Sequence, residues 1–418
     1  MEKKYNKNIK AFYREDRVAL FNIDNLERIY VDNETFDKLK SGKFSTLSEF
    51  EINELINKGF IIDTNKEVKN LPKRKKERKM KCDYIRLVIT QNCNLQCQYC
   101  FVDKESKCFS KSDIVQLGKF IKHDCEKNVE IQFFGGEPLL YFNIIKKCVQ
   151  YLSDVCKEFN ISYIITTNGT LINREIATFF KKYDFSVFVS IDGDKEIHNS
   201  YRKNKYGIGS YNDVIKGVEF LKKQQVNIRA LITYNAYNRN KLDFVVKHIS
   251  NEIGIKQLAI NTPQPSETGW KIDGKEFSKD LIRAIREARR CGGKLYSIAD
   301  KIFYSLSTKQ IQYNSCSRAR DNYSVTIIPD FKLSFCNVCW NEDILCDKCQ
   351  NVSEYISDWK NKKYKDNVDR CTNCVAKNIC TGKCPIEKYY YNKGEGLASS
   401  EDQKCVFFRE FIKWAIWI

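Results

Sequence analysis

The chain has 418 residues, of which 42% are hydrophobic, and its 71 basic and 53 acidic residues give a formal net charge of +18. This length exceeds one ordinary hydrophobic core and predicts about two or three domains. The opening segment MEKKYNKNIK has no apolar run behind it, and no stretch approaches the length that spans a bilayer. We therefore expect neither a signal peptide nor a membrane partner.

Residues 1–72 contain no cysteine and alternate short strands with helices. Thr46 and Glu49 have the spacing of a capping box ahead of a helix over residues 49–60. Strands are expected over 17–23, 27–31 and 60–63, and a first helix over 33–42. This pattern predicts a small α+β unit of winged-helix type. The basic run LPKRKKERKMK then opens with proline, and we interpret residues 73–83 as a linker.

From residue 84 to about 300, short apolar strands alternate with amphipathic helical stretches. Strand–helix repeats of this length predict a parallel sheet with helices outside it. Six such units make an open or partial barrel rather than a closed eight-fold one. The six expected strands cover residues 84–90, 129–134, 162–167, 185–191, 227–233 and 256–261.

Unusual polar and Gly-rich motifs follow the first four of these strands directly. QNCNLQC, GGEP (135–138), NGT (168–170) and DGD (192–194) stand in this order. Parallel α/β folds build their sites at the carboxyl ends of strands. The four motifs are therefore predicted to converge on one mouth of the barrel.

Residues 301–418 hold ten of the 19 cysteines and show little apolar periodicity. The odd cysteine number and the great length argue against a secreted disulfide protein, and three histidines are too few for mixed Cys/His zinc sites. Iron–sulfur or four-cysteine zinc sites remain. We expect a small metal-organised domain. At its end, Phe408, Phe411, Ile412 and Ala415 have the spacing of a helix that docks on a core.

The first motif offers only three ligands, Cys93, Cys97 and Cys100. Three thiolates hold three irons of a [4Fe–4S] cubane and leave the fourth iron open for chemistry, whereas the alternative is a zinc site shared with a remote cysteine. The sequence CNLQCQYCF, with GGEP after the next strand, resembles the signature of the radical S-adenosylmethionine superfamily. The resemblance implies a partial (β/α)6 barrel in which S-adenosylmethionine binds the open iron and is cleaved to a radical that abstracts a hydrogen atom.

The same resemblance implies contacts to S-adenosylmethionine. Glu137 is expected to face the methionine ammonium, and Ser190, Asp192 and Arg202 are expected to hold ribose and carboxylate. No catalytic residue is assigned beyond the cluster. The full expected set is Tyr99, Gly135, Gly136, Glu137, Thr167, Asn168, Ser190, Asp192 and Arg202.

The cysteine-rich tail resembles the SPASM extension of radical enzymes that modify peptides, which implies two auxiliary [4Fe–4S] clusters and three clusters in all. One would use Cys371, Cys374, Cys380 and Cys405, and the other Cys316, Cys336 and Cys384. The family has glycine where this chain has Phe331. Cys339, Cys346 or Cys349 can complete the second set, or these three can form a separate site with Cys336. The isolated cysteines Cys82, Cys108, Cys125, Cys148, Cys156 and Cys291 are expected to be small buried hydrophobes.

The N-terminal unit is similar to PqqD-like elements that capture a leader peptide by strand addition. Together these features predict a cytoplasmic peptide maturase of an anaerobe, which forms a cross-link in a Cys-rich ribosomal precursor. A thioether is the leading product, and carbon–carbon linkage or epimerisation are alternatives. The expected electron donor is a flavodoxin or ferredoxin. A sulfatase-maturating enzyme is a second hypothesis, weakened because Asn337 stands where those enzymes carry Asp. A non-catalytic nucleic-acid-binding metalloprotein is a third, disfavoured by the three-cysteine loop.

Overall fold

The computed structural model describes residues 3–63, 81–102, 104, 106–263, 272–311, 323–334, 371–380 and 403–418. Its centre is a nine-stranded sheet with the order β12-β11-β10-β9-β8-β7-β6-β13-β14. All six predicted barrel strands are present, and adjacent ones pair in parallel. They are β6 (Cys82–Thr90), β7 (Cys125–Gly135), β8 (Asn160–Thr167), β9 (Ser186–Ser190), β10 (Asn227–Thr233) and β11 (Gln257–Asn261).

The sheet continues beyond the six predicted strands at both edges. β12 (Lys294–Tyr296) adds in parallel to β11, and β13 (Tyr323–Ile328) adds in parallel to β6. β14 (Lys332–Ser334) turns back antiparallel to β13. Periodicity did not predict these three strands, because β12 and β14 have only three residues each and β13 pairs with β6, which is distant in sequence.

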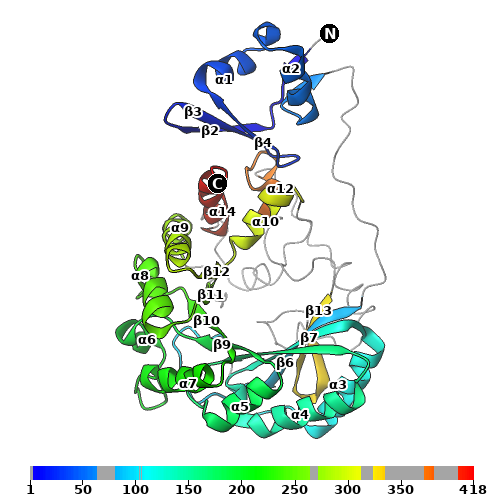
Figure 1. The fold of residues 1–418 in the computed structure, drawn as a ribbon, viewed down its shortest axis with the longest axis vertical. Helices are drawn as coiled ribbons and strands as arrows, with labels where there is room; N and C mark the ends of the chain where they lie inside the picture. Colours follow the sequence, from blue (N-terminus) through cyan, green and yellow to red (C-terminus); the bar gives the residue numbers. More distant parts are fainter. Residues whose placement is uncertain are drawn as a thin grey trace, which may run out of the picture.

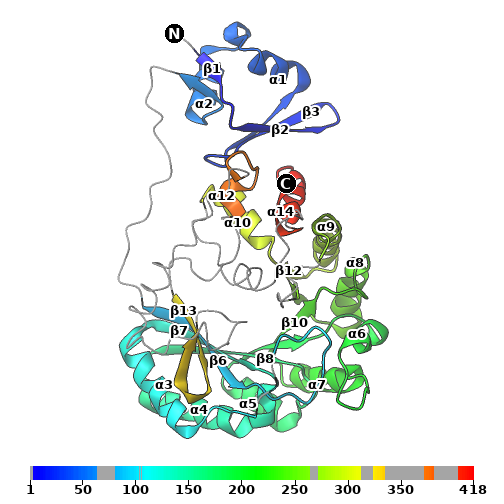
Figure 2. The same cartoon turned by 180° about the vertical axis from the view of Figure 1, so that it is seen from behind.

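The strands alternate in burial because helices cover only one face of the sheet. In β9, Val187 and Val189 are fully buried, whereas Ser186, Phe188 and Ser190 on the other face are half-buried. Figures 1 and 2 show the helices along the outer, convex face and the concave face turned toward the rest of the chain. The outer helices include α3 (Lys111–Asp124), α4 (Phe142–Val155), α5 (Arg174–Lys182), α6 (Lys195–Tyr201), α7 (Tyr211–Lys223) and α8 (Leu242–Lys247).

The N-terminal unit is a three-stranded antiparallel sheet with helices on one face. Its order is β2 (Ile9–Arg14), β3 (Arg17–Asn22), β4 (Arg28–Asp32), and β3 is buried on both faces. One face packs on α1 (Asn33–Lys40) and α2 (Glu49–Asn57). The predicted capping box was misplaced by two residues: Ser48, not Thr46, caps α2 and pairs with Glu51. Thr46 instead ends a 3-10 turn over Phe44–Thr46. A short pair, β1 (Lys3–Tyr5) and β5 (Ile61–Asp63), completes the unit.

The other face of the N-terminal sheet packs against the end of the chain. Ala19 and Phe21 belong to the same buried cluster as Phe407 and Phe411 of α14 (Gln403–Ala415). The predicted C-terminal helix is therefore confirmed, and it also contacts α9 (Gly274–Arg290) through the Phe277–Phe407 ring pair, 5.1 Å between centroids. In both views α14 lies between α9 and the N-terminal sheet (Figures 1 and 2).

Two short helices complete this junction. Asn378 of α12 (Lys377–Cys380) donates hydrogen bonds to the carbonyls of Ile23 and Asp24, at 2.7 and 3.0 Å. Lys309, just after α10 (Asp300–Thr308), pairs with Glu27. Most of the expected linker 73–83 lies outside the described residues, as do Cys316, Cys336, Asn337, Cys339, Cys346, Cys349 and Cys384.

Candidate active site at the carboxyl ends of the strands

Cys93, Cys97 and Cys100 lie on the loop that leaves β6, which we call the cluster loop (residues 91–102). Its backbone is held by the segment after α6, since the Gln96 N–H donates to the Lys203 carbonyl at 2.7 Å. The Cys100 N–H donates to the Cys97 carbonyl at 3.1 Å, which closes a turn between these two cysteines. All three thiols are free, and Cys100 is exposed.

One side chain that follows β8 and one that follows α6 lie close to the sulfurs of this loop. The Asn168 amide nitrogen lies 3.8 Å from Cys93 Sγ, and the Leu95 N–H donates to the same sulfur at 3.4 Å. Arg202 Nη1 lies 4.0 Å from Cys97 Sγ. These donors favour thiolates over thiols, because N–H groups stabilise negative charge on sulfur.

The GGEP turn is pinned to the cluster loop by backbone contacts that only glycine allows. A Cβ on Gly135, whose φ is +139°, would lie 2.0 Å from the Thr90 carbonyl oxygen, and one on Gly136 would lie 2.2 Å from that of Asn92. The next residue, Glu137, donates its N–H to Asn92 at 2.8 Å. The GGEP motif therefore positions the cluster loop.

Glu137 is fully buried, and its carboxylate accepts three hydrogen bonds. They come from the Leu139 N–H at 3.0 Å, the Thr167 hydroxyl at 2.7 Å and the Asn168 N–H at 2.7 Å. Burial nevertheless outweighs these bonds and raises the pKa of Glu137 to about 7. No described cation pairs with it. A buried carboxylate of this kind fits an ammonium ligand, as expected from the sequence.

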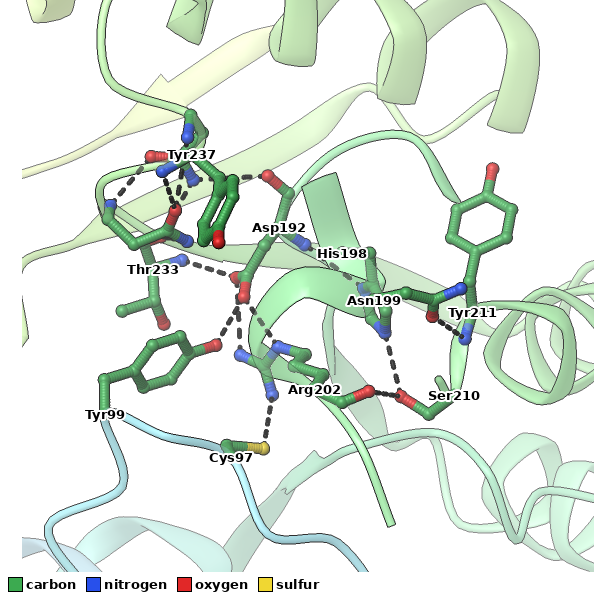
Figure 3. A network of polar contacts seen from close by, with 12 residues as sticks. Cys97, Tyr99, Asp192, His198, Asn199, Arg202, Ser210, Tyr211, Thr233 and Tyr237 are labelled. Atoms are coloured by element: carbon green, nitrogen blue, oxygen red, sulfur yellow. Dashed lines mark hydrogen bonds and ion pairs between the residues drawn. The ribbon is translucent and has the colours of Figure 1, made fainter. Parts of the chain in front are cut away.

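Asp192 and Arg202 form a buried ion pair with its nitrogen and oxygen 2.9 Å apart. Asp192 also accepts from the Tyr99 hydroxyl and from the Thr233 N–H at 2.9 Å (Figure 3). Burial alone would lower the pKa of Arg202, but the adjacent Asp192 raises it, so the guanidinium stays charged. Asp192, expected with Ser190 and Arg202 to hold ribose and carboxylate, orients Arg202 and Tyr99 in this structure.

His198 contacts the backbone of Asp192 directly and the backbone of Arg202 through Ser210. Its Nδ1 accepts from the Asp192 N–H at 3.4 Å, and its Nε2 lies 3.0 Å from the Ser210 hydroxyl, which donates to the Arg202 carbonyl at 2.9 Å (Figure 3). Burial lowers the pKa of His198 to about 3, so the ring is neutral. This role could not be predicted from sequence, because an isolated histidine is most often a core residue.

Burial raises the pKa of Cys93 to about 12 and also raises that of Cys97, although Arg202 opposes the shift at Cys97. Metal must therefore displace protons from these thiols when it binds. Among the described residues, no three side chains converge on a single metal ion. A cubane separates its thiolates further, since each sulfur binds a different iron. Three thiols on one loop, with N–H donors at two sulfurs and a buried anion beside them, fit such a cluster.

The concave face carries polar residues that sequence reasoning missed. Arg86 Nε donates to Gln132 at 2.9 Å, and Gln132 donates to Thr166 at 2.7 Å, which links β6, β7 and β8. Further along, the Arg229 guanidinium lies 4.5 Å from the ring centroid of Phe188 and 4.1 Å from that of Tyr296. Strand alternation would have placed these side chains opposite the helices.

The remaining sequence candidates divide into three groups. Ser190 ends β9 on the concave face, half-buried. Cys371, Cys374 and Cys380 share one short segment, and Cys405 begins α14; all four are half-buried. Cys82 and Cys125, register partners on β6 and β7, are buried in the core as expected. Cys148 and Cys156 are buried as expected, whereas Cys108 and Cys291 are only half-buried.

Residues 87–238 match the Radical SAM superfamily, and this range contains the cluster loop, Glu137, Asp192 and Arg202. The chain carries a radical SAM domain. This domain relates the chain to radical SAM enzymes that include peptide and sulfatase maturases. The predicted family and parallel α/β fold are confirmed. No helix in the described ranges is long and apolar enough to cross a membrane.

Two curated relatives illustrate the similarity. The radical SAM cyclopropyl synthase TigE of Paramaledivibacter caminithermalis is 28% identical over 401 residues, covering 84% of this chain and 80% of TigE. A cysteine-type anaerobic sulfatase-maturating enzyme of Clostridium novyi is 32% identical, but covers 39% of this chain and 46% of its own.

Solved structures share the fold at lower identity. The sulfatase maturase anSMEcpe with bound AdoMet has a TM-score of 0.67 at 20% identity, covering 79% of this chain and 96% of its own. Streptococcus suis SuiB bound to S-adenosylmethionine has a TM-score of 0.55 at 15% identity, covering 97% and 100%.

Proposed function

We propose that this enzyme modifies a ribosomally made precursor peptide by hydrogen abstraction followed by formation of a new bond. The observation that carries the proposal is the joint placement of a three-cysteine loop at the strand ends and a separate α+β unit packed on α14. The three-cysteine loop would provide the site of radical chemistry. The α+β unit would provide a separate surface for a peptide. TigE and SuiB, the latter also solved with its precursor peptide SuiA, support a peptide substrate.

Within this proposal, Cys93, Cys97 and Cys100 would hold a [4Fe–4S] cluster, which with S-adenosylmethionine supplies one-electron cleavage and a primary carbon radical. Glu137 would bind the methionine ammonium, because its carboxylate is otherwise a buried charge without a cation. Gly135 and Gly136 admit the close approach of backbone to the loop. Asp192 would keep the Arg202 fork oriented, so that Nη1 stays beside Cys97 and within reach of a carboxylate.

Tyr99, Thr167, Asn168 and Ser190 line the same strand ends, and we assign them to the ribose and adenine side of the cofactor. Tyr99 is held between partners, since its hydroxyl donates to Asp192 and its ring lies 5.5 Å from that of Tyr201. Asn168 is already committed to Asn94 and to Cys93 Sγ. We therefore assign Asn168 mainly to positioning the cluster loop.

We place the leader peptide on an edge of the N-terminal sheet. β2 and β4 are the edge strands of that sheet, and β3 between them is buried. An added strand would satisfy the backbone groups of one edge without disturbing the core. The domain boundaries 1–72, 73–83, 84–300 and 301–418 belong to this proposal, as do auxiliary clusters at Cys371, Cys374, Cys380 and Cys405 and at Cys316, Cys336 and Cys384.

Co-expression with a short open reading frame adjacent to the gene tests the function. A cross-link removes two hydrogens from the peptide, and a thioether also blocks one cysteine from alkylation. The same mass loss with every thiol still reactive would identify a carbon–carbon bond, the product class suggested by the name of TigE. Unchanged mass with solvent deuterium uptake would identify epimerisation. Cys97→Ala must abolish the change, and retained activity would refute the cluster assignment.

The sulfatase maturases are the second candidate, favoured by the fold match to anSMEcpe over 96% of that chain. A sulfatase-derived peptide with a cysteine or serine at the target position distinguishes the two. Formation of formylglycine on that peptide would overturn the precursor proposal. We further propose a flavodoxin or ferredoxin as electron donor, and an anaerobic cytoplasm as the location, because an open-site cluster requires reducing conditions.

A further inference from the structure

A tight hairpin, residues 203–209, stands beside the cluster loop. Lys203 and Gly209 form an antiparallel bridge, and the Asn204 N–H donates to the Ile208 carbonyl at 2.9 Å. The Asn204 side chain accepts from the N–H groups of Tyr206 and Ile208, at 2.9 and 3.1 Å. These bonds fix the tip in one conformation.

The base of this hairpin is joined to the backbone on both sides of Cys97. Gln96 donates to the Lys203 carbonyl at 2.7 Å, and Gln98 donates to the Tyr201 carbonyl at 3.3 Å. Leu95 also forms an antiparallel bridge with Asn204. The tip therefore lies only two residues beyond a direct backbone contact with the cluster loop.

Large apolar side chains are exposed at this tip. Tyr206 is 74% exposed and Ile208 is 63% exposed, which places them among the four most exposed large hydrophobic residues of the described chain. Lys205 Nζ lies 5.0 Å from the centroid of the Tyr206 ring, so cation and ring form one surface. Exposed apolar side chains rimmed by charge mark interaction sites.

The charge around the tip has one sign. Residues 199–210 contain Arg202, Lys203 and Lys205 and no acidic residue. Lys104, two residues after the cluster loop, adds a further charge, and its Nζ donates to the Leu95 carbonyl of that loop at 2.6 Å. Asp192 pairs with Arg202 and neutralises its charge. The positive charge of this surface therefore comes from Lys104, Lys203 and Lys205. Such a surface attracts an acidic partner.

We propose that Lys203, Lys205, Tyr206 and Ile208, with Lys104, form the docking surface for an acidic one-electron carrier protein. This inference rests on the proposed function, which requires one electron at the cluster loop. The carrier would lose one electron, and the cluster that Cys93, Cys97 and Cys100 would hold would gain it, with no bond formed or broken. Electron-transfer encounters use small, weak interfaces steered by charge, which suits a patch of this size.

Binding of a purified flavodoxin to the anaerobically reconstituted enzyme, measured by calorimetry at several salt concentrations, tests the surface directly. Lys203→Glu with Lys205→Glu should raise the Kd at least about tenfold at low salt and remove its salt dependence. Tyr206→Ser with Ile208→Ser should weaken binding at all salt concentrations, because apolar contact is not screened. A ferredoxin provides a second probe of the same chemistry.

Lys119→Glu with Lys147→Glu is the matched control, since both lysines are exposed on α3 and α4 and the net charge changes equally. Equal Kd values for the control and the hairpin variant would overturn the proposal. Weaker precursor binding with unchanged flavodoxin binding would assign the patch to the peptide instead, and also overturn it. Dithionite reduces the cluster without docking, so dithionite-driven cofactor cleavage by the variant separates failure of docking from failure of the enzyme.

Discussion

The Asp192–Arg202 pair is the most heavily constrained ionic contact of the site, since both side chains are buried. Asp192→Asn would leave the guanidinium charged without a counterion and should reduce the free energy of unfolding by about 3–5 kcal/mol. Urea unfolding of anaerobically purified protein measures this. The matched control is Glu175→Gln, which breaks the exposed pair with Lys146 and should cost less than about 1 kcal/mol.

If Asp192→Asn does not fold, the double variant Asp192→Leu/Arg202→Met decides the cause. Removing both charges leaves no uncompensated ion, so the double variant should be more stable than Asp192→Asn. A double variant that is less stable would show that the pair acts through its other contacts, to Tyr99 and Thr233, and not through its charge.

Glu137 gives stability a specific dependence on pH. Its folded pKa, about 7, is above the ordinary 4.5, so the native state binds the extra proton between these values. Its contribution is therefore fully present below pH 4.5 and is lost as pH rises to 7, by about 3 kcal/mol in all. Glu137→Gln should remove this fall, whereas Glu219→Gln on the surface of α7 should keep it. The slope against pH is the measure, and an unchanged slope in Glu137→Gln contradicts the assignment.

At Phe331 the chain departs from the family pattern, and the backbone there is strained. It adopts φ +53° after Asp330 at +66°, at the position where the SPASM resemblance expects glycine. Its ring lies 6.1 Å from that of Phe120, which compensates in part. Phe331→Gly should be more stable than Phe331→Ala by about 1 kcal/mol, because both lose the ring but only glycine is relaxed at this φ. Thermal unfolding compares the two. Equal or reversed order would mean that the backbone relaxes in the variants.

At the scale of elements, β4 is anchored to the C-terminal helix. The Tyr30 hydroxyl donates to the Ile416 carbonyl at 2.6 Å, and its ring lies 5.7 Å from that of Trp417. Tyr30→Phe should lower the protection of β2–β4 in hydrogen exchange by about 1 kcal/mol, and Trp417→Ala by more. Tyr13→Phe, at a side chain 65% exposed within the same unit, is the control and should change nothing. Equal protection in all three variants would show that the junction does not stabilise the sheet.

The elements also show what local sequence could predict. The six central strands follow from their short apolar runs between helical stretches, and α14 from its helical spacing of apolar residues. β13 was missed, because its strand identity depends on pairing with β6, which is distant in sequence. The capping residue of α2 was misplaced because Thr46 and Ser48 both precede a glutamate three residues on, and only the 3-10 turn before α2 selects Ser48.

The same limit applies to the site. The strand-end motifs identified which residues meet, since parallel strands bring their carboxyl ends together. Which contacts each of these residues makes within the site depended on three-dimensional geometry. The pairing of Asp192 with Arg202 and the contact of Asn168 with a cluster-loop sulfur did not follow from the motifs. His198 and Arg229 carry no motif. The role of His198 follows from the packing of α6 against Asp192, and that of Arg229 from the register of β10.

For the whole molecule, the number of metal clusters decides between one chemical centre and three. Reconstituted enzyme should hold about twelve irons per chain, if each of three cubanes holds four. The triple variant Cys93→Ala/Cys97→Ala/Cys100→Ala should lose about four irons and all cofactor cleavage. Cys371→Ala/Cys374→Ala/Cys380→Ala should also lose about four, but keep dithionite-driven cleavage, because these cysteines lie outside the 87–238 radical SAM domain. Cys148→Ala, a buried thiol of α4, is the control and should keep every iron. Wild-type protein with about four irons and bound zinc would refute the auxiliary clusters while leaving the open site at the cluster loop intact.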